Sequence, residues 1–537
     1  MQEIELKFLV PESRLKSLMR QAQVKSSQIT QLAAHYYDTP DQQLAQAGIG
    51  LRIRKEGDTW VQTIKAGGDG IAARLEHNAT LDNAKVQAML DNNKLMPDLT
   101  IYKNTSIASA LADFKLKKLA QKLTRQYVTD VQRTTRLLME DSKDEDSNSI
   151  EMAYDHGEVI HGHDDTQRDP IQEIEFELVS GDLDFLFTTA KTWCKRYKLC
   201  LSTVTKAERG GLLITGQNHS PAVKADLSQL NINKDSSMPA FVRAAVHNCL
   251  LQILPNSSAV VAGSKDDEHI LQLSIGINRL RAALQAFAGF SDELNPDWLP
   301  ILKQTATLLG SYRELAYLAS YIEPKLQEFS APVVDWTADL EALKIKPIDA
   351  VAANDFQLTL LELIAFVMSD PHLEPQADKC ANDKLAKILS KQHTKFVKAE
   401  QSLESKNDAS DDGSDSKDLE SVDLHNVNLE SSDKDQALHK LYRQLTDLRY
   451  INEFAVPLLN KKDGKKKAKR WLKRLIKAQK ALGRYCEHLQ YQQCYQQKSE
   501  ENSNALYGAG WFAATLKEDL KRTEKHLPKV KDSSIFW

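Results

Sequence analysis

Alternation of apolar and charged residues is the dominant pattern near the start of the chain. Residues 3–8 read Glu-Ile-Glu-Leu-Lys-Phe, and this period of two predicts a β-strand. One face of the strand is apolar, and the other carries Glu3, Glu5 and Lys7. Antiparallel sheets often have one solvated face, so this stretch by itself indicates only a half-buried strand.

The same alternation returns at residues 51–54, 60–65, 74–76, 127–139 and 173–178. The polar positions of these and nearby segments hold long charged side chains of both signs: Arg52, Arg54, Lys65, Arg74, Arg133, Lys206, Glu173, Glu175 and Glu177. Charges that face into a closed barrel need partners. A polyphosphate with a divalent cation supplies partners for charges of both signs, because Arg and Lys bind phosphate oxygens while carboxylates bind Mg²⁺ or Mn²⁺.

From about residue 236 the apolar period changes to 3.6, which predicts helices. The expected helices lie at residues 239–253, 268–289, 298–323, 355–368, 437–459, 465–491 and 507–527. Residues 400–435 contain no aromatic residue and are rich in Ser, Asp, Glu, Lys and Asn, which predicts a disordered acidic insert. We therefore expect an α+β chain with a barrel domain at 1–215, a linker at 216–235 and an all-α helical domain at 236–535.

A run of basic residues stands out within the helical part, at residues 461–477. It contains Lys465, Lys466, Lys467, Lys469, Arg470, Lys473, Arg474 and Lys477. On a helix these side chains spread over more than one face, and they could bind polyphosphate, RNA or an acidic partner. The alternative is a solvated helix whose charge is balanced by the acidic insert upstream.

Composition adds few constraints. The formal net charge is −4, so nothing in the total charge favours nucleic acid or a membrane. Six scattered cysteines without a CxxC motif are typical of a reducing compartment. The chain opens directly on a charged strand rather than a signal peptide, and no apolar run approaches the roughly 18 residues of a membrane span. We expect a cytoplasmic protein that does not bind a membrane, and the total charge makes nucleic acid the less favoured partner.

Several motifs of the first 215 residues occur together, in the same order, in a known family. They are Glu3-x-Glu5-x-Lys7, Tyr37-Asp38-Thr39-Pro40, Leu51-Arg52-Ile53-Arg54, Thr63-Ile64-Lys65, Arg74-x-Glu76, Glu173-x-Glu175-x-Glu177 and Lys206-Ala207-Glu208-Arg209-Gly210. This region resembles the CYTH domain of the triphosphate tunnel metalloenzyme superfamily. The resemblance implies a closed eight-stranded antiparallel β-barrel whose ionic faces point into a tunnel.

The resemblance also implies an activity, the metal-dependent hydrolysis of inorganic tripolyphosphate to pyrophosphate and phosphate. It assigns Mg²⁺ or Mn²⁺ to Glu3, Glu5, Glu173 and Glu175. It assigns the phosphates to Lys7, Arg52, Arg54, Lys65, Arg74, Arg133 and Lys206. The residues expected to be catalytic are Glu5, Lys7, Arg52 and Lys65. For Glu76, Glu151, Asp155 and Glu177 a ligand role and a structural role both stay open.

The helical part resembles a CHAD domain, an all-helical bundle of two similar halves that is associated with polyphosphate binding. The matching segments are Asn278-Arg279-Leu280-Arg281, Leu309-Gly310-x-x-Arg313-Glu314, His439-x-Leu441, Leu448-Arg449-Tyr450 and Leu482-Gly483. The usual histidine and basic residues are replaced at Leu271, Ser274, Tyr442, Thr446 and Asp447. The resemblance thus implies that the helical scaffold is retained while its surface carries fewer basic residues than usual. Whether this domain binds long-chain polyphosphate therefore stays open.

Two alternative functions also stay open. A nucleoside or thiamine triphosphatase, or an adenylate cyclase of the CYTH type, would share the tunnel but needs groups that bind a base, a ribose or thiamine. A polyphosphate-binding scaffold without turnover would not need the four acidic residues that the resemblance assigns to metal.

Overall fold

The computed structural model describes residues 2–67, 71–92, 94–140, 148–408, 433–458, 462–533 and 535–537. The chain divides into two compact units. Unit 1 consists of Met1–Lys224, Leu250–Leu273 and Ile348–Ser369, and unit 2 consists of Ala225–Cys249, Ser274–Pro347 and Asp370–Trp537. Unit 1 therefore contains two segments from the helical part of the sequence. The domain limits expected at residues 215 and 235 stay a prediction.

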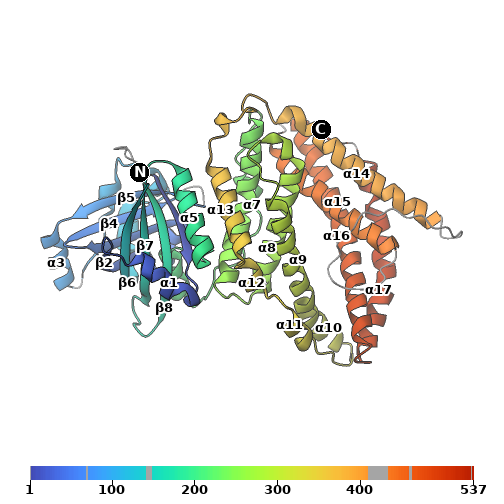
Figure 1. The fold of residues 1–537 in the computed structure, drawn as a ribbon, viewed down its shortest axis with the longest axis horizontal. Helices are drawn as coiled ribbons and strands as arrows, with labels where there is room; N and C mark the ends of the chain where they lie inside the picture. Colours follow the sequence, from blue (N-terminus) through green and yellow to red (C-terminus); the bar gives the residue numbers. More distant parts are fainter. Residues whose placement is uncertain are drawn as a thin grey trace. The chain divides into compact units, whose positions relative to one another are not determined.

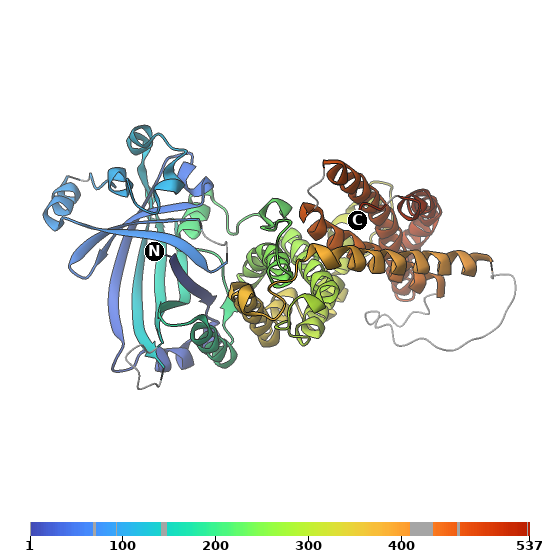
Figure 2. The same ribbon diagram turned by 90° about the horizontal axis from the view of Figure 1, so that it is seen from above.

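A closed antiparallel β-barrel forms the centre of unit 1 (Figures 1 and 2). Its strands are β1 (Gln2–Leu9), β2 (Gln28–Asp38), β3 (Ile49–Glu56), β4 (Thr59–Ala66), β5 (Ala73–Leu81), β6 (Thr124–Met139), β7 (Ser149–His161) and β8 (Arg168–Ser180). They follow the order β5-β4-β3-β2-β6-β7-β8-β1, and pairing of β5 with β1 closes the ring. A ninth short strand, β9 (Cys200–Leu201), adds to β1. The predicted α+β class and eight-stranded barrel are confirmed.

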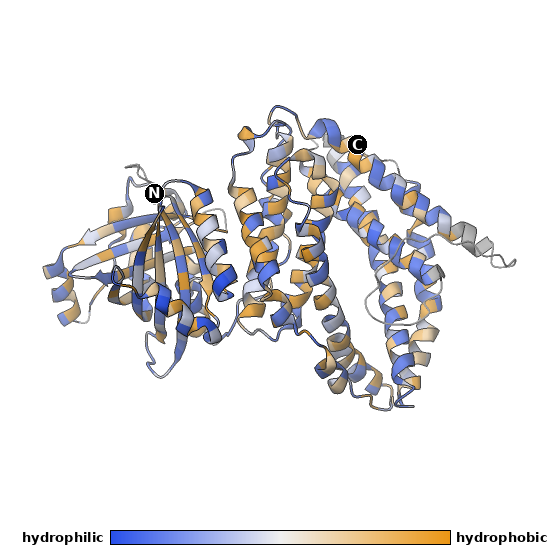
Figure 3. Ribbon diagram, viewed as in Figure 1, coloured by the Kyte–Doolittle hydropathy of each residue, from blue (hydrophilic) through white to orange (hydrophobic). Residues whose placement is uncertain are grey.

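The pairing register places the charged residues of neighbouring strands beside one another. Lys7 pairs with Glu175, Lys65 with Glu76, and Arg133 with Asp155. Since successive side chains of a strand point to opposite faces, the apolar residues between them point out of the barrel. Figure 3 shows the resulting alternation of polar and apolar residues along the strands.

The apolar core of unit 1 therefore lies outside the barrel wall, under the helices. On one side, Phe8 and Phe176 pack edge to face with their ring centroids 5.9 Å apart, and Trp193 of α5 (Leu183–Tyr197) lies 5.5 Å from the Phe176 ring. On another side, Ile53 and Ile64 belong to a buried cluster with residues of the 86–123 region. The remaining helices of residues 1–224 are α1 (Glu12–Ala22), α2 (Gln43–Gln46), α3 (Asn83–Asp91), α4 (Leu116–Lys122) and α6 (Lys206–Thr215).

Among the described residues, Thr337–Met368 could cross a membrane by length and mean hydropathy alone, contrary to the expectation that no apolar run approaches the length of a membrane span. In the structure it forms three separate helices, α11 (Thr337–Ala342), α12 (Pro347–Val351) and α13 (Asn354–Met368). Helix α13 packs on α5 and buries Phe356, Leu360 and Ile364 within unit 1. The apolar residues of α13 thus form part of a protein core, as the sequence predicts for residues 355–368.

The described part of unit 2 is helical. Helices α7 (Met238–Val261) and α8 (Asp267–Ala286) contribute to both units. The other long helices are α9 (Trp298–Tyr317), α14 (Asn382–Asp408), α15 (Asp433–Ala455), α16 (Lys462–Lys498) and α17 (Ala505–His526), with the short α10 (Glu323–Gln327) and α18 (Pro528–Lys531).

The expected disorder of residues 400–435 is wrong at both ends of the segment. Residues 400–408 continue α14, because Leu403 is buried in an apolar cluster and the Glu400 carboxylate pairs with Lys531 Nζ at 3.6 Å. Residues 433–435 begin α15. The rest of the predicted insert lies outside the described residues.

A half-buried carboxylate in unit 2 is expected to make stability depend on pH. Burial raises the pKa of Glu314 on α9 to about 7, although Arg313 opposes the shift. A glutamate in an unfolded chain titrates near about 4.3, so the folded state holds this proton longer and loses stability as the pH rises from about 4 to about 7. Glu314→Gln should therefore increase the free energy of unfolding by about 2 kcal/mol at pH 8 and leave it unchanged at pH 4. Urea unfolding at the two pH values measures this, and an equal effect at both would contradict it.

Candidate active site in the barrel

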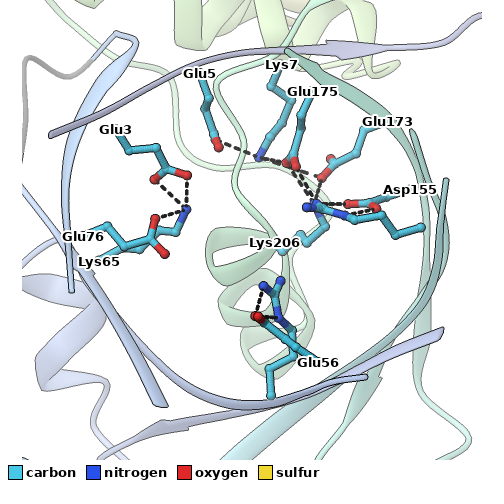
Figure 4. A network of polar contacts seen from close by, with 12 residues as sticks. Glu3, Glu5, Lys7, Glu56, Lys65, Glu76, Asp155, Glu173, Glu175 and Lys206 are labelled. Carbon is cyan, nitrogen blue, oxygen red and sulfur yellow. Dashed lines mark hydrogen bonds and ion pairs between the residues drawn. The ribbon is translucent and has the colours of Figure 1, made fainter. Parts of the chain in front are cut away.

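The barrel encloses a ring of charged side chains that point inward from seven strands, β1 and β3 to β8, and from helix α6 (Figure 4). Most of them form two groups on opposite sides of the ring, and Glu56 pairs with Arg54 apart from both groups. The Lys206 cluster consists of Lys7, Arg133, Asp155, Glu173, Glu175 and Lys206. The Lys65 cluster consists of Glu3, Lys65 and Glu76. Glu5 lies between them, with its carboxylate 3.9 Å from Lys7 Nζ.

Lys206 is the centre of the first cluster. Its Nζ atom lies 2.7 Å from Asp155 Oδ2, 2.5 Å from Glu173 Oε1 and 2.9 Å from Glu175 Oε1. Arg133 donates two hydrogen bonds to Asp155, at 2.7 and 2.6 Å, and a third to Glu175 Oε2 at 2.7 Å. Three buried carboxylates are thus neutralised by cations from β1, β6 and the first turn of α6.

These contacts keep the cluster charged although it is buried. Burial alone would raise the pKa of Asp155, but Lys206 and Arg133 hold it below its usual value. In the same way, Lys206, Lys7 and Arg133 lower the pKa of Glu175 well below the ordinary range against the effect of burial. The carboxylates in turn raise the pKa of Lys206 well above normal. Each charge depends on its neighbours, since an unpaired buried charge is strongly destabilising.

The Lys65 cluster contains two hydrogen-bonded carboxyl groups, Glu3 and Glu76. Lys65 donates to both oxygens of Glu3, at 2.8 and 2.6 Å, and its Nζ lies 2.9 Å from Glu76 Oε2. Burial and a hydrogen bond with Glu76 raise the pKa of Glu3 to about 8. The same hydrogen bond and Lys65 lower the pKa of Glu76 to about 2, against the effect of burial. Burial and the hydrogen bond thus favour the protonated form of Glu3 and the ionised form of Glu76.

Glu177 and Glu151 pair across β7 and β8 next to these clusters. Burial raises the pKa of Glu177 to about 7, and the nearby carboxylates Glu5, Glu76 and Glu151 add to the shift while Lys65 opposes it. A region with this many carboxylates favours an added cation, because it would relieve their mutual repulsion.

The two arginines of β3 contact residues that the sequence did not single out for the site. Arg52 Nη1 lies 3.3 Å from the hydroxyl oxygen of Tyr36, whose ring stacks on Tyr127 with 4.8 Å between centroids. Arg54 forms an ion pair with Glu56, two positions along the same strand. Glu56 continues the alternation of Arg52 and Arg54, so its position on the inner face could have been predicted from the period of two.

The acidic residues fit a hard divalent cation. Oxygens of Asp155, Glu173 and Glu175 lie within 4.8 Å of one another, and all three residues are buried. Glu173 Oε2 is buried and has no hydrogen-bond partner among the described residues. Carboxylate oxygens at this spacing suit Mg²⁺ or Mn²⁺, and a carboxylate oxygen without a donor is a free ligand position.

The predicted metal ligands are thus divided between the walls. Glu173 and Glu175 lie together in the Lys206 cluster, joined by Asp155, whose role the sequence left open. Glu3 lies in the Lys65 cluster and is bound to Lys65. Of the predicted phosphate ligands, Lys7, Arg133 and Lys206 gather on one wall, Lys65 on the other, and Arg52 and Arg54 on β3. Arg74 lines a hollow with Glu5 and Lys7.

Three neighbouring motifs lie outside the ring. Arg136 donates to the Gln21 carbonyl oxygen at 2.9 Å, on the side of the wall opposite Arg133. The carboxylate of Asp38 accepts backbone N–H groups of residues 39, 44 and 45, so it holds a turn. At the end of β7, His161 Nδ1 accepts the backbone N–H of His163 at 3.1 Å and so holds the turn that follows.

Comparison with known proteins identifies both parts of the chain. The family description "CYTH domain" matches residues 1–210, and "CHAD domain" matches residues 244–493. An inorganic triphosphatase of Haemophilus influenzae is 31% identical over 220 residues, which cover 40% of this chain and 55% of that protein. The match thus spans only about half the length of this relative.

Solved structures are similar at low identity. The CHAD domain from the plant Ricinus communis is 20% identical, with 58% of this chain and 97% of that chain covered and a TM-score of 0.43. HpAC1 from Hippeastrum, described as having a dominant triphosphatase activity, is 15% identical, with coverages of 40% and 96% and a TM-score of 0.26. Similarities this weak support no conclusion about activity. The motif order, the closed barrel and the two family matches together show that the chain contains a CYTH domain at residues 1–210 and a CHAD domain at residues 244–493.

Proposed function

We propose that the barrel hydrolyses inorganic tripolyphosphate to pyrophosphate and phosphate with Mg²⁺. The observation that carries this proposal is the ring of inward cations facing a buried acidic triad from several strands. A linear triphosphate carries charge along its whole length, and cations on opposite walls can hold it at several points. The relative in Haemophilus influenzae, itself an inorganic triphosphatase, supports the same substrate.

The side chains supply positioning and charge neutralisation, which are the main requirements of phosphoryl transfer. Lys65 lies on one wall and Lys7, Arg133 and Lys206 lie on the other, so together they can bind phosphates at both ends of the substrate. Arg52 and Arg54 extend from β3 and can bind oxygens between them. Substrate and metal would compete with the present ion pairs, so Lys206 would exchange carboxylate oxygens for phosphate oxygens.

Asp155, Glu173 and Glu175 would hold the metal, with Glu5 beside them. When bound, a divalent cation neutralises charge on the phosphates and lowers the pKa of a water that it binds. Glu3 and Glu177 keep protons to higher pH than ordinary glutamates, since their pKa values are about 8 and 7. Either can therefore give or accept a proton near neutral pH.

The proposal is tested by phosphate release from tripolyphosphate, ATP and thiamine triphosphate, each with Mg²⁺ and with EDTA. We expect cleavage of tripolyphosphate with Mg²⁺ alone. Comparable cleavage of ATP or thiamine triphosphate would favour the alternative triphosphatases, and conversion of ATP to cyclic AMP would favour a cyclase. Binding of tripolyphosphate without cleavage under any divalent metal would favour a non-catalytic scaffold. A cytoplasmic location is part of the proposal, in keeping with six free cysteines.

A second function, binding of long-chain polyphosphate by the helical part, is favoured by one feature of unit 2. A hollow of about 580 Å³, counting open solvent, is lined by Arg470, Lys473, Arg474, Lys477, His526 and Lys529. None of the described residues that line it is acidic. Burial lowers the pKa of His526, and Lys529, Lys477 and Lys525 lower it further. A polyanion would relieve the repulsion, and four of the lining residues belong to the basic run predicted from the sequence.

Removing charge from this hollow should weaken polyphosphate binding. We expect Lys473→Gln/Lys477→Gln to bind long-chain polyphosphate roughly tenfold more weakly at low salt, because fewer counterions are released. Tripolyphosphate turnover in the barrel should not change. Filter binding with the full chain, in EDTA, measures the affinity. The matched control is Lys517→Gln/Lys521→Gln, which removes two exposed lysines of α17 outside the hollow. Equal weakening by both pairs would show that only net charge matters.

A further inference from the structure

The segment from β9 to the start of α6 places Lys206 in the barrel. Strand β9 pairs with β1 at the edge of the sheet, and the Ser202 N–H donates to the Lys7 carbonyl oxygen at 2.9 Å. Thr205 then caps α6, its hydroxyl oxygen accepting the Glu208 N–H at 2.9 Å. Lys206 is the first residue of that helix. Its position therefore depends on how the backbone of residues 201–205 is held.

A glutamine of α13 holds one end of this segment. The Leu201 N–H donates to Gln357 Oε1 at 2.8 Å. Gln357 is fully buried, and its Nε2 donates to the Val351 carbonyl oxygen at 2.7 Å, which fixes the orientation of the side-chain amide. An N–H at a sheet edge has no strand partner, and a buried one without a partner is costly. Gln357 supplies that partner from outside the barrel.

A serine of α7 holds the other end. Ser258 Oγ accepts the Thr203 N–H at 3.0 Å and lies 3.3 Å from Thr203 Oγ1. Its own hydroxyl donates to the Leu254 carbonyl oxygen one turn earlier in α7, so its orientation is also fixed. Ser258 is 1% exposed. Two buried polar side chains, each with a second anchor, thus hold the segment on either side of Ser202.

The same two helices reach the charged residues of the tunnel. A hollow of about 410 Å³, counting open solvent, is lined by Glu5, Lys7 and Arg74 of the barrel together with Leu254 of α7 and Ile364 of α13. All these residues belong to unit 1. These parts of α7 and α13, which lie beyond the CYTH match, are therefore structural neighbours of the active-site wall.

We propose that Gln357 and Ser258 are positioning residues of the triphosphate site, which hold the β9–α6 segment so that Lys206 lies among Asp155, Glu173 and Glu175. This inference rests on the proposed function only in the statement that Lys206 binds triphosphate. On this inference α7, the first helix of the CHAD domain, and α13 both help to position a charged residue of the tunnel. A chain cut after the CYTH match would lack both anchors.

Acetylation of lysines in the full-length protein tests the position of Lys206 without any substrate. In the native protein Lys206 should react slowly, since its side chain is 10% exposed and makes three ion pairs. In Gln357→Met and in Ser258→Ala, short pulses of an acetylating ester, read by peptide mass spectrometry, should modify Lys206 about ten times faster, which corresponds to about 1.4 kcal/mol. Lys65, on the opposite wall, is the internal reference and should keep its rate.

The matched control is Gln252→Leu. Gln252 is also a buried amide of α7, but it donates to Gln272 of α8 rather than to the β9–α6 segment. It should lower stability without changing the Lys206 rate. If Lys206 keeps its native rate in both Gln357→Met and Ser258→Ala, or if Lys206 and Lys65 accelerate together, the inference is wrong.

Tripolyphosphate affinity provides a second readout, measured by calorimetry in EDTA. Gln357→Met should weaken binding in the native background and have no further effect in a Lys206→Met background, because a residue that acts through Lys206 cannot act without it. Additive losses would assign Gln357 a merely structural role. If the native protein cleaves no triphosphate, the proposed function fails, while the acetylation rates still decide the inference.

Discussion

Replacing Lys206 with methionine is expected to lower kcat/KM for tripolyphosphate by about a hundredfold to a thousandfold. Lys206 is the cation common to Asp155, Glu173 and Glu175, with all three distances below 3 Å. Without it, the site loses one phosphate ligand and three buried carboxylates lose their common partner. Steady-state kinetics with Mg²⁺ measures the loss.

The same substitution should also shift the pH dependence. Lys206 lowers the pKa of Asp155 and Glu175 in the native protein, so its removal should raise both pKa values. The stability that these carboxylates contribute is present above their unfolded-state pKa and lost as the pH falls through the folded value. In Lys206→Met this loss should therefore begin at higher pH on acidification.

Two comparisons make the Lys206 result specific. Lys55→Met removes an exposed lysine of β3 and should leave kcat/KM unchanged. Lys206→Arg keeps the charge and should recover part of the activity. A Lys206→Met enzyme that folds and retains more than a tenth of native kcat/KM would remove Lys206 from the site.

Glu5→Gln is expected to abolish Mg²⁺-dependent turnover, by at least about a hundredfold, while leaving the fold intact. Among the described residues, the Glu5 carboxylate has one ion-pair partner within 4 Å, Lys7 Nζ at 3.9 Å, and its charge also acts on Lys65 from farther away. It therefore contributes little to the ion pairs that hold the barrel together. A carboxylate that stabilises the fold so weakly, yet faces the acidic triad, is better explained as a ligand.

Thermal unfolding and turnover should be measured on the same Glu5→Gln preparation. The informative contrast is Glu175→Gln, which disrupts contacts with Lys7, Arg133 and Lys206 and should lower both activity and the unfolding temperature. Unchanged activity in Glu5→Gln would overturn the metal assignment of Glu5.

Much of the barrel could be predicted because side-chain direction in a strand is a local property. A period of two places Glu3, Glu5 and Lys7 on one face whatever the partner strand is. The same argument separates Arg133, inside, from Arg136, outside. It could also have found Glu56, which continues the pattern of Arg52 and Arg54. Helical parts were predicted equally well where the apolar period was strong, as in α13.

The periodicity could not predict which strands, and therefore which charged residues, become neighbours in the barrel. The sequence grouped Glu3 and Glu5 with Glu173 and Glu175, while the structure puts Glu3 beside Lys65 and Glu76 and brings Asp155 into the acidic triad. These neighbours are set by strand order, register and barrel closure, which join residues far apart in the chain.

The sequence by itself therefore determined the two domain types, the inward direction of the charged strand faces and most of the residues that line the tunnel. Only the tertiary structure decided which charges pair and that Lys206 lies at the centre of the carboxylates. It alone also showed that Gln357 and Ser258 hold the segment before Lys206. The reason is that ion pairs and buried hydrogen bonds form between whatever groups the folded backbone brings within about 3 Å, and that proximity is not encoded in local periodicity.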